Sequence, residues 1–218
     1  MITIKSHEEK EVFLNDFAIR SFRDIGDLDY IAARMAYRTK SYPQFLWSGQ
    51  QTIEKYLKCI LLLNRIKATK VRHDLSAALS LIEKNLPFQI LLSEESRKII
   101  EYFDTYGRFR YFETPYHVYG EYLINFDKVV WELRRYCRTI NYDYIRPDGT
   151  KKSALSHEPW IIEQSEKLPH QNFNRVDGLL EKIIKEKKHP AREFLIWKNL
   201  FFGSQARKRI KIQGFVYS

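Results

Sequence analysis

The sequence predicts an all-α protein, a helical bundle followed by a C-terminal helical extension. Glycine (8) and proline (7) are scarce among the 218 residues, which favours long helices over a turn-rich β fold. Apolar residues recur every three or four positions along most of the chain, as they do on the buried face of a helix. They make up 44% of the sequence, which is enough for a substantial core.

The N-terminal region is expected to form two helices. Ser6 and Glu9 have the spacing of a capping box, in which two side chains satisfy free N–H groups at a helix start. The first helix is predicted to begin there. Gly26 and Asp27 then interrupt the apolar pattern, and Asp27 is suited to cap a second helix over residues 28–40.

Residues 45–63 are predicted to be the central helix of the bundle. An apolar face this broad needs neighbours on several sides. The residues of that face are Ile53, Tyr56, Leu57, Ile60, Leu61 and Leu63. The opposite flank is polar and consists of Gln50, Gln51, Glu54, Lys55 and Lys58.

Three further helices follow, each with a start signal. Asp74 and Ser93 are suitable N-caps for two of them. Thr114 and Pro115 suit the N-cap and first position of a third, which is expected to continue to about Tyr142.

The region of residues 141–159 is turn-rich, with Pro147-Asp148-Gly149 at its centre. We therefore divide the chain into a bundle, residues 1–142, and a basic, mostly helical extension, residues 143–218. The expected elements of the extension are two helices, at 176–188 and 190–203, and a short strand at 210–212. A second short terminal strand is expected at residues 1–5, where apolar and polar residues alternate.

The chain is strongly basic, with a formal net charge of +10 and an isoelectric point near 9.5. This charge suits an anionic partner, RNA or a nucleotide first, although a basic protein without such a ligand has the same composition. Residues 143–218 hold 15 Lys and Arg against 9 Asp and Glu, so the extension is the more basic part. A nucleic-acid contact could be partly its role.

Several classes of protein are excluded by what the sequence lacks. The two cysteines, Cys59 and Cys137, have no partners at metal-ligand spacing and are expected to be small core residues. No His, Cys and Asp set has metal-binding spacing either. The N-terminus has no apolar signal segment and no stretch is long enough to span a membrane, so we expect a cytoplasmic protein.

Arg110 and His117 are the candidates for catalysis. His117 would be the third residue of the helix that starts at Thr114, and Arg110 lies seven residues earlier. A helix start offers free N–H groups and the positive end of the dipole, which together attract a phosphate. That dipole also favours a neutral imidazole, so His117 could act as a general base while Arg110 stabilises the phosphate.

The reaction that these residues predict is attack of an RNA 2′-hydroxyl on the adjacent phosphate, with no metal or other cofactor. The spacing also allows His117 to be an ordinary surface or capping residue. The expected binding residues around the pair are Arg108, Tyr111, Tyr116, Lys55 and Lys58. For the tyrosines, base stacking and packing at a helix or dimer interface both remain open. The lysines could equally be a solvated stripe.

The residues around the central helix resemble the HEPN family (higher eukaryotes and prokaryotes nucleotide-binding). The pattern Q-x-x-E-K-x-x-K occurs at residues 51–58, and a basic loop separates it from His-Asp-Leu at residues 73–75. The resemblance covers about residues 24–142. It implies an antiparallel up-and-down helical bundle that is commonly dimeric.

Many HEPN proteins are metal-independent ribonucleases with an arginine, four to six residues and then a histidine, and six residues separate Arg110 from His117. Tyr111 stands where active members usually carry Asn, Asp or His. Other members pair with a nucleotidyltransferase as toxin and antitoxin, or bind nucleotides without cleaving them. Two functions therefore stay open: a ribonuclease, as a toxin or defence component, and a non-catalytic module that binds a nucleotide or a partner nucleotidyltransferase. A third is a dimerisation domain whose basic tail contacts nucleic acid.

Overall fold

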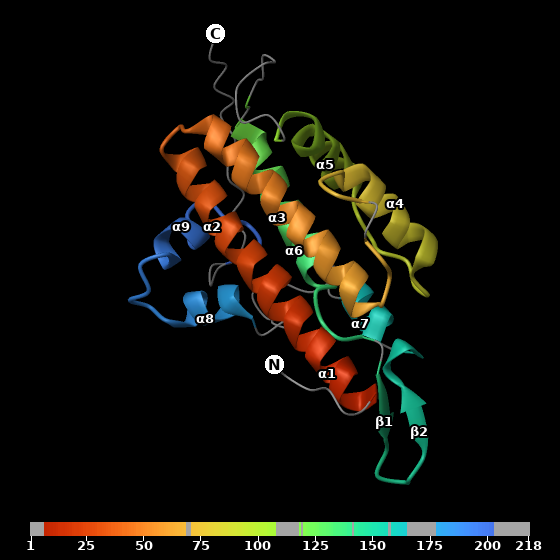
Figure 1. Ribbon diagram of the computed structural model, residues 1–218. Coiled ribbons are helices and arrows are strands. Elements are labelled where there is room, and N and C mark those ends of the chain that lie inside the picture. Colours follow the sequence, from red (N-terminus) through yellow and green to blue (C-terminus); the bar gives the residue numbers. More distant parts are fainter. Residues whose placement is uncertain are drawn as a thin grey trace, which may run out of the picture.

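The predicted all-α architecture is confirmed by the computed structural model, which describes residues 7–68, 71–107, 118, 120–140, 142–156, 158–164 and 178–202 (Figure 1). Its helices are α1 (His7–Ala18), α2 (Asp24–Arg38), α3 (Tyr42–Leu63), α4 (Leu75–Asn85), α5 (Glu94–Tyr106), α6 (Gly120–Arg134), α7 (Glu158–Gln164), α8 (Leu179–Lys185) and α9 (Arg192–Ile196). A single hairpin is described, formed by β1 (Asp143–Ile145) and β2 (Lys151–Ser153).

Residues 7–38 form one continuous helical stretch, because α1 passes into α2 through a π-helical turn at Ile19–Arg23. The predicted break at Gly26 and Asp27 is therefore wrong. A Cβ on Gly26 would lie only 3.1 Å from the ring of Tyr56 on α3, and the Tyr56 hydroxyl donates to Asp27 Oδ1 at 2.7 Å. Both residues serve close packing against α3 instead of ending a helix.

The prediction of a central helix is confirmed by α3, which contacts α1, α2, α4, α5 and α6. It runs antiparallel to α2, with α6 behind it (Figure 1). Pro43 lies in its first turn, where the missing N–H costs nothing, so the helix begins three residues before the predicted start. The apolar face predicted for this helix is buried throughout.

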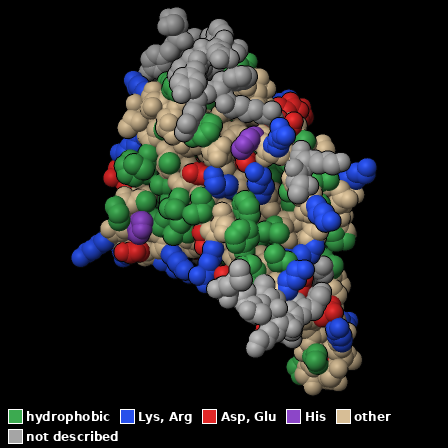
Figure 2. Space-filling view, viewed as in Figure 1, with side chains coloured by type: hydrophobic (Ala, Val, Ile, Leu, Met, Phe, Trp, Pro, Cys, Tyr) green, Lys and Arg blue, Asp and Glu red, His purple; other side chains and the backbone are tan. Residues whose placement is uncertain are grey.

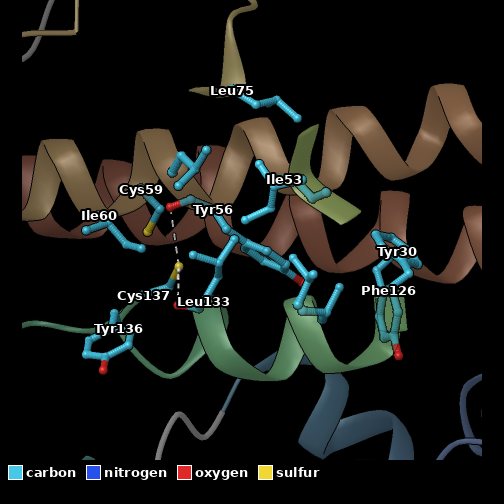
Figure 3. Packing of buried hydrophobic residues seen from close by; sticks show 14 of the residues in the cluster. Tyr30, Ile53, Tyr56, Cys59, Ile60, Leu75, Phe126, Leu133, Tyr136 and Cys137 are labelled. Carbon is cyan, nitrogen blue, oxygen red and sulfur yellow. Dashed lines mark hydrogen bonds between the residues drawn. The ribbon is translucent and has the colours of Figure 1, made fainter. Parts of the chain in front are cut away.

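The core is built around α3 and includes buried residues of α2, α4, α5, α6, α8 and α9. Figure 3 shows part of it, between α3 and the C-terminal end of α6. Ile53, Cys59 and Ile60 point from α3 toward Leu133 and Cys137. The cysteines are free and buried, as predicted, and burial raises the pKa of the Cys137 thiol well above its usual value. They are packing residues of this core.

The caps of α4 and α5 are those that the sequence predicts. Asp74 accepts a hydrogen bond from the backbone N–H of Ala77 at 2.7 Å, and Ser93 accepts one from Ser96 N–H at 3.3 Å. Gly107 ends α5. Each signal is local, since a cap bonds within its own first turn.

α6 ends at Arg134, eight residues before the predicted end. The apolar rhythm continues beyond it because the following turns still pack on the core. The residues of the predicted apolar rhythm are all buried: Leu123, Phe126, Val130, Leu133, Cys137 and Ile140. The predicted start at Thr114 and Pro115 lies outside the described residues.

The turn at Pro147-Asp148-Gly149 is confirmed, but the strands that flank it were not predicted. Asp148 Oδ1 accepts the Thr150 N–H at 2.9 Å, and Gly149 has a φ of 80°, which glycine adopts without strain. The antiparallel hairpin projects beyond the end of the bundle (Figure 1). The strands expected at residues 1–5 and 210–212 lie outside the described residues.

The C-terminal helices are attached to the bundle by buried charges as well as by apolar contacts. Arg134 donates to Asp27 of α2 and to Glu181 of α8, with all three side chains buried. Arg34 of α2 donates to Asp127 of α6 and, at 2.9 Å, to the carbonyl oxygen of Phe194. These contacts join the bundle, residues 1–142, to the extension, residues 143–218. The division between them at residue 142 remains a proposal.

Candidate functional site

Polar side chains gather on one flank of α3 and meet a histidine from the turn before α4. We call this group the Glu54 cluster, and it consists of Gln50, Gln51, Glu54, Lys55, Lys58 and His73. Positions four apart on a helix lie on one line, which places Gln50, Glu54 and Lys58 in a row. Figure 2 shows Lys and Arg side chains over the middle of α3 on this face of the molecule.

Glu54 is the centre of the cluster. Its Oε2 lies 3.0 Å from His73 Nδ1, and its Oε1 accepts from Lys58 Nζ at 2.5 Å. Burial acts to raise the pKa of the Glu54 carboxyl, but the hydrogen bonds from Lys58 and His73 outweigh it and hold that pKa below its usual value. Glu54 is therefore ionised at neutral pH.

His73 differs from Glu54 in its exposure. The His73 side chain is 71% exposed, whereas that of Glu54 is 8% exposed. An ionised carboxylate accepts only, so Nδ1 of a neutral His73 carries the proton and donates it to Glu54. The second ring nitrogen, Nε2, is then left on the solvent side.

The backbone around His73 is held from two helices. Gln50 Nε2 donates to the His73 carbonyl oxygen at 3.2 Å. Asp104, in the last turn of α5, accepts from the N–H groups of Leu75 at 3.0 Å and Ser76 at 3.2 Å. The start of α4, and with it the His73 turn, is thereby fixed against α3 and α5.

Lys55 and Lys58, predicted to bind nucleic acid or nucleotide, are both held in ion pairs. Lys55 Nζ lies 2.6 Å from Asp29 Oδ2, and Lys58 is paired with Glu54. Their side chains are 21% and 24% exposed. A phosphate would therefore have to share each ammonium group with the carboxylate already present.

The other predicted site residues lie outside the described residues. They are Arg108, Arg110, Tyr111, Tyr116 and His117. The nearest described residues on either side are Gly107 and Val118. A Cβ on Gly107 would lie 2.4 Å from Gln50 Cβ, and Val118 packs on the core. Gly107, at the end of α5, therefore lies beside Gln50 of the Glu54 cluster.

A hollow of about 560 Å³ lies elsewhere, between the loop before α5 and the middle of α6. Its cationic lining residues, Arg97 and Lys128, are paired with Glu83 and Glu95. This hollow shares no residue with the Glu54 cluster. Within the described ranges, no group of three or more His, Cys, Asp or Glu side chains is arranged to hold a metal ion.

The HEPN domain family matches residues 19–140, more than half of the chain. The chain belongs to the HEPN family. No curated protein and no solved structure matches it. The HEPN match runs from the π-helical turn to the end of the α6 region, so it contains the Glu54 cluster, Arg110 and His117, and leaves out the hairpin and α7 to α9.

The pairing of Glu54 with His73 was not predicted, although both residues belong to the pattern that resembles HEPN proteins. They are 19 residues apart and come from different elements. Arg72, directly before His73, has a φ of 43°, a conformation that sequence periodicity does not indicate. Of the described residues, no helix is both long and apolar enough to cross a lipid bilayer.

Proposed function

We propose that this HEPN protein is a metal-independent endoribonuclease, acting as a toxin or defence component. The observation that carries the proposal is the Arg110-to-His117 motif, with six intervening residues, inside the region matched by the HEPN family. The net charge of +10 supports an RNA substrate, because a polyanion is attracted to a basic surface.

In the proposed reaction His117 removes the proton from a 2′-hydroxyl. The resulting oxygen attacks the adjacent phosphorus, while Arg110 stabilises the negative charge that develops on the phosphate. The bond from phosphorus to the 5′-oxygen breaks, which yields a 2′,3′-cyclic phosphate and a 5′-hydroxyl. Every group that this reaction requires is a side chain or the RNA itself.

Five further residues are proposed to hold the RNA: Arg108, Lys55, Lys58, Tyr111 and Tyr116. The cations would contact phosphates, and the tyrosines would stack on unpaired bases. Lys55 and Lys58 belong to the Glu54 cluster, and Gln50 of the same cluster lies beside Gly107 at the end of α5. This placement supports a shared RNA-binding surface. We further propose a homodimer, with a nucleotidyltransferase as the antitoxin.

The test is cleavage of labelled single-stranded RNA in the presence of EDTA. We expect Arg110→Ala and His117→Ala each to lower the rate at least about 10²-fold, the usual contribution of a positioned acid or base. Arg97→Ala, in α5, and His189→Ala, before α9, are matched controls that should keep the wild-type rate. Equal activity in all four variants would refute the proposal.

A second function is favoured by Tyr111, which stands where active HEPN members usually carry Asn, Asp or His. Under this alternative the protein binds a nucleotide or a partner nucleotidyltransferase without cleaving RNA. Wild-type protein that binds nucleotides at micromolar concentration, but leaves every RNA intact, would support it.

A further inference from the structure

The hairpin of β1 and β2 has two faces that carry different side chains. It lies outside the region matched by the HEPN family and projects beyond the end of the bundle (Figure 1). Side chains alternate between the two faces of a strand, and residues directly opposite each other share a face. The register pairs Tyr144 with Lys152 and Ile145 with Lys151. The two neighbouring lysines therefore lie on opposite faces.

The face that holds Tyr144 and Lys152 is aromatic and cationic. The antiparallel pairing continues past both ends of β1, because the Tyr142 carbonyl oxygen and the Arg146 N–H make cross-strand hydrogen bonds of 2.8 and 2.9 Å. Tyr142 and Arg146, two residues before and after Tyr144, are thereby placed on its face. We call Tyr142, Tyr144, Arg146 and Lys152 the Tyr144 face.

The Tyr144 face is open to solvent. Arg146 and Lys152 are exposed, Tyr142 is 42% exposed and Tyr144 is half-buried. The ring centroids of the two tyrosines lie 6.4 Å apart, with an angle of 51° between the rings. Two aromatic rings and two cations thus lie along one surface of a short ribbon.

The acidic residues of the hairpin do not oppose these cations. Asp143 is on the other face, where its Oδ2 lies 2.9 Å from the ammonium group of a lysine. Asp148 accepts two hydrogen bonds within the turn, at 2.9 and 2.6 Å. In the part of the chain that the structure describes, neither Arg146 nor Lys152 forms an ion pair. The lysines of the Glu54 cluster, by contrast, share their charge with carboxylates.

We propose that the Tyr144 face binds single-stranded RNA, as a site separate from the bundle. The tyrosines stack on unpaired bases, while Arg146 and Lys152 contact the phosphates beside those bases. The net charge of +10 favours a polyanionic partner. The choice of RNA over DNA rests on the proposed function. The stacking site itself goes beyond that function, because the hairpin binds whether or not the bundle cleaves.

The test is the binding of a labelled single-stranded RNA of about 12 nucleotides, measured by fluorescence anisotropy in EDTA. Every 2′-hydroxyl of this RNA is methylated, which removes the nucleophile of the proposed cleavage, so that binding is measured alone. We expect Tyr142→Ala and Tyr144→Ala each to weaken binding at least about fivefold, because stacking on one base contributes at least that much. Tyr144→Phe keeps the ring and should bind like the wild type.

The two lysines of β2 provide a matched pair of variants. Lys152→Ala and Lys151→Ala each remove one positive charge from the same strand, on opposite faces. We expect Lys152→Ala to weaken binding and to lower the slope of log affinity against log salt by about 0.7, the value for one phosphate contact on a single strand. Arg146→Ala should do the same, and Lys151→Ala should change neither quantity.

A cross-linking experiment locates the contact on the full chain. Uridines of the same RNA are replaced with 5-iodouridine, which on irradiation forms a covalent bond to an aromatic ring stacked on it. We expect the linked peptide, identified by mass spectrometry, to contain Tyr142 or Tyr144. Cross-links confined to other peptides would overturn the inference.

Three binding results would also overturn it. They are unchanged affinity of both tyrosine-to-alanine variants, equal losses from the two lysine variants, and binding of single-stranded DNA but not of RNA. RNA binding that needs the tyrosines, without cleavage of ordinary RNA, would support the inference and refute the proposed function. Cleavage of ordinary RNA with normal binding by every hairpin variant would do the reverse.

Discussion

Replacing Arg134 with methionine should strongly destabilise the protein, because two buried carboxylates depend on its guanidinium group. The Arg134 side chain is 2% exposed, and its partners Asp27 and Glu181 are 0% and 6% exposed. Nε and Nη2 donate to Asp27 at 2.7 and 2.8 Å, and Nη1 and Nη2 donate to Glu181 at 2.5 and 2.7 Å. Methionine fills much of the volume but leaves two buried carboxylates without their cation.

Breaking a buried ion pair on one side costs about 3–5 kcal/mol. Part of the loss is offset because Asp27 keeps its bond from Tyr56 and Glu181 keeps the Gly178 N–H at 2.8 Å. Leaving two buried carboxylates without their cation increases the cost again, so we expect the free energy of unfolding to fall by about 4 kcal/mol. With a urea dependence of about 2 kcal/mol per molar, the unfolding midpoint should fall by about 2 M.

The loss should also depend on pH. Burial already raises the pKa of Asp27 in the wild-type chain, against the opposing effect of Arg134, and removing the guanidinium would raise it further. A raised pKa gives stability that is present at low pH and lost as pH rises through that pKa. The difference between variant and wild type should therefore be smaller at pH 5 than at pH 8.

The assay is urea unfolding followed by far-ultraviolet circular dichroism at both pH values. Lys98→Met is the matched control, because its pair with Glu94 is 71% and 77% exposed, and its midpoint should match that of the wild type. A shift of less than about 0.5 M for Arg134→Met at pH 8 would refute the reasoning, since it corresponds to only about 1 kcal/mol.

Three further predictions concern single positions. Gly49→Ala would place a Cβ 2.0 Å from the Phe103 ring, so thermal unfolding should show a loss of about 1–3 kcal/mol, and an unchanged melting temperature would contradict this packing. Asp74→Ala removes the cap of α4 and should cost about 1 kcal/mol, measured by urea unfolding, whereas Asp74→Asn should keep most of it. Glu54 has a lowered pKa, so its contribution to stability is present above pH 4.5, its usual value, and is lost as pH falls through the folded-state pKa. Glu54→Gln should remove that part of the acid dependence, which urea midpoints between pH 3 and pH 6 would measure.

The sequence predicted those features of the fold that depend on neighbouring residues. Asp74 and Ser93 act as caps within one helical turn, and the apolar spacing of residues 45–63 requires burial whatever the partner. Features that depend on distant residues were missed. Gly26 indicates a break by its own preference, yet the approach of Tyr56, 30 residues later, gives it a place inside a helix. The strands of the hairpin have three residues each, too few for a pattern of alternation to be visible.

In the candidate site, too, features set by neighbouring residues were predicted and features set by distant residues were missed. The Arg110-to-His117 spacing and the polar flank of α3 can be read along the chain. The contact between Glu54 and His73 cannot, because it depends on the turn at Arg72 and on hydrogen bonds from Gln50 and Asp104. The buried ion pairs of Arg134 could not be predicted either, because their partners Asp27 and Glu181 lie 107 and 47 residues away in the sequence.

The most direct test of the central claim, that this HEPN protein cleaves RNA through its own side chains, is to identify the ends of the cleaved RNA. Purified protein would be incubated with RNA in excess EDTA and the fragments analysed by mass spectrometry. The account predicts a 2′,3′-cyclic phosphate on the upstream fragment and a 5′-hydroxyl on the downstream one, both absent with His117→Ala. Intact RNA, or fragments with 3′-hydroxyl and 5′-phosphate ends, would contradict it.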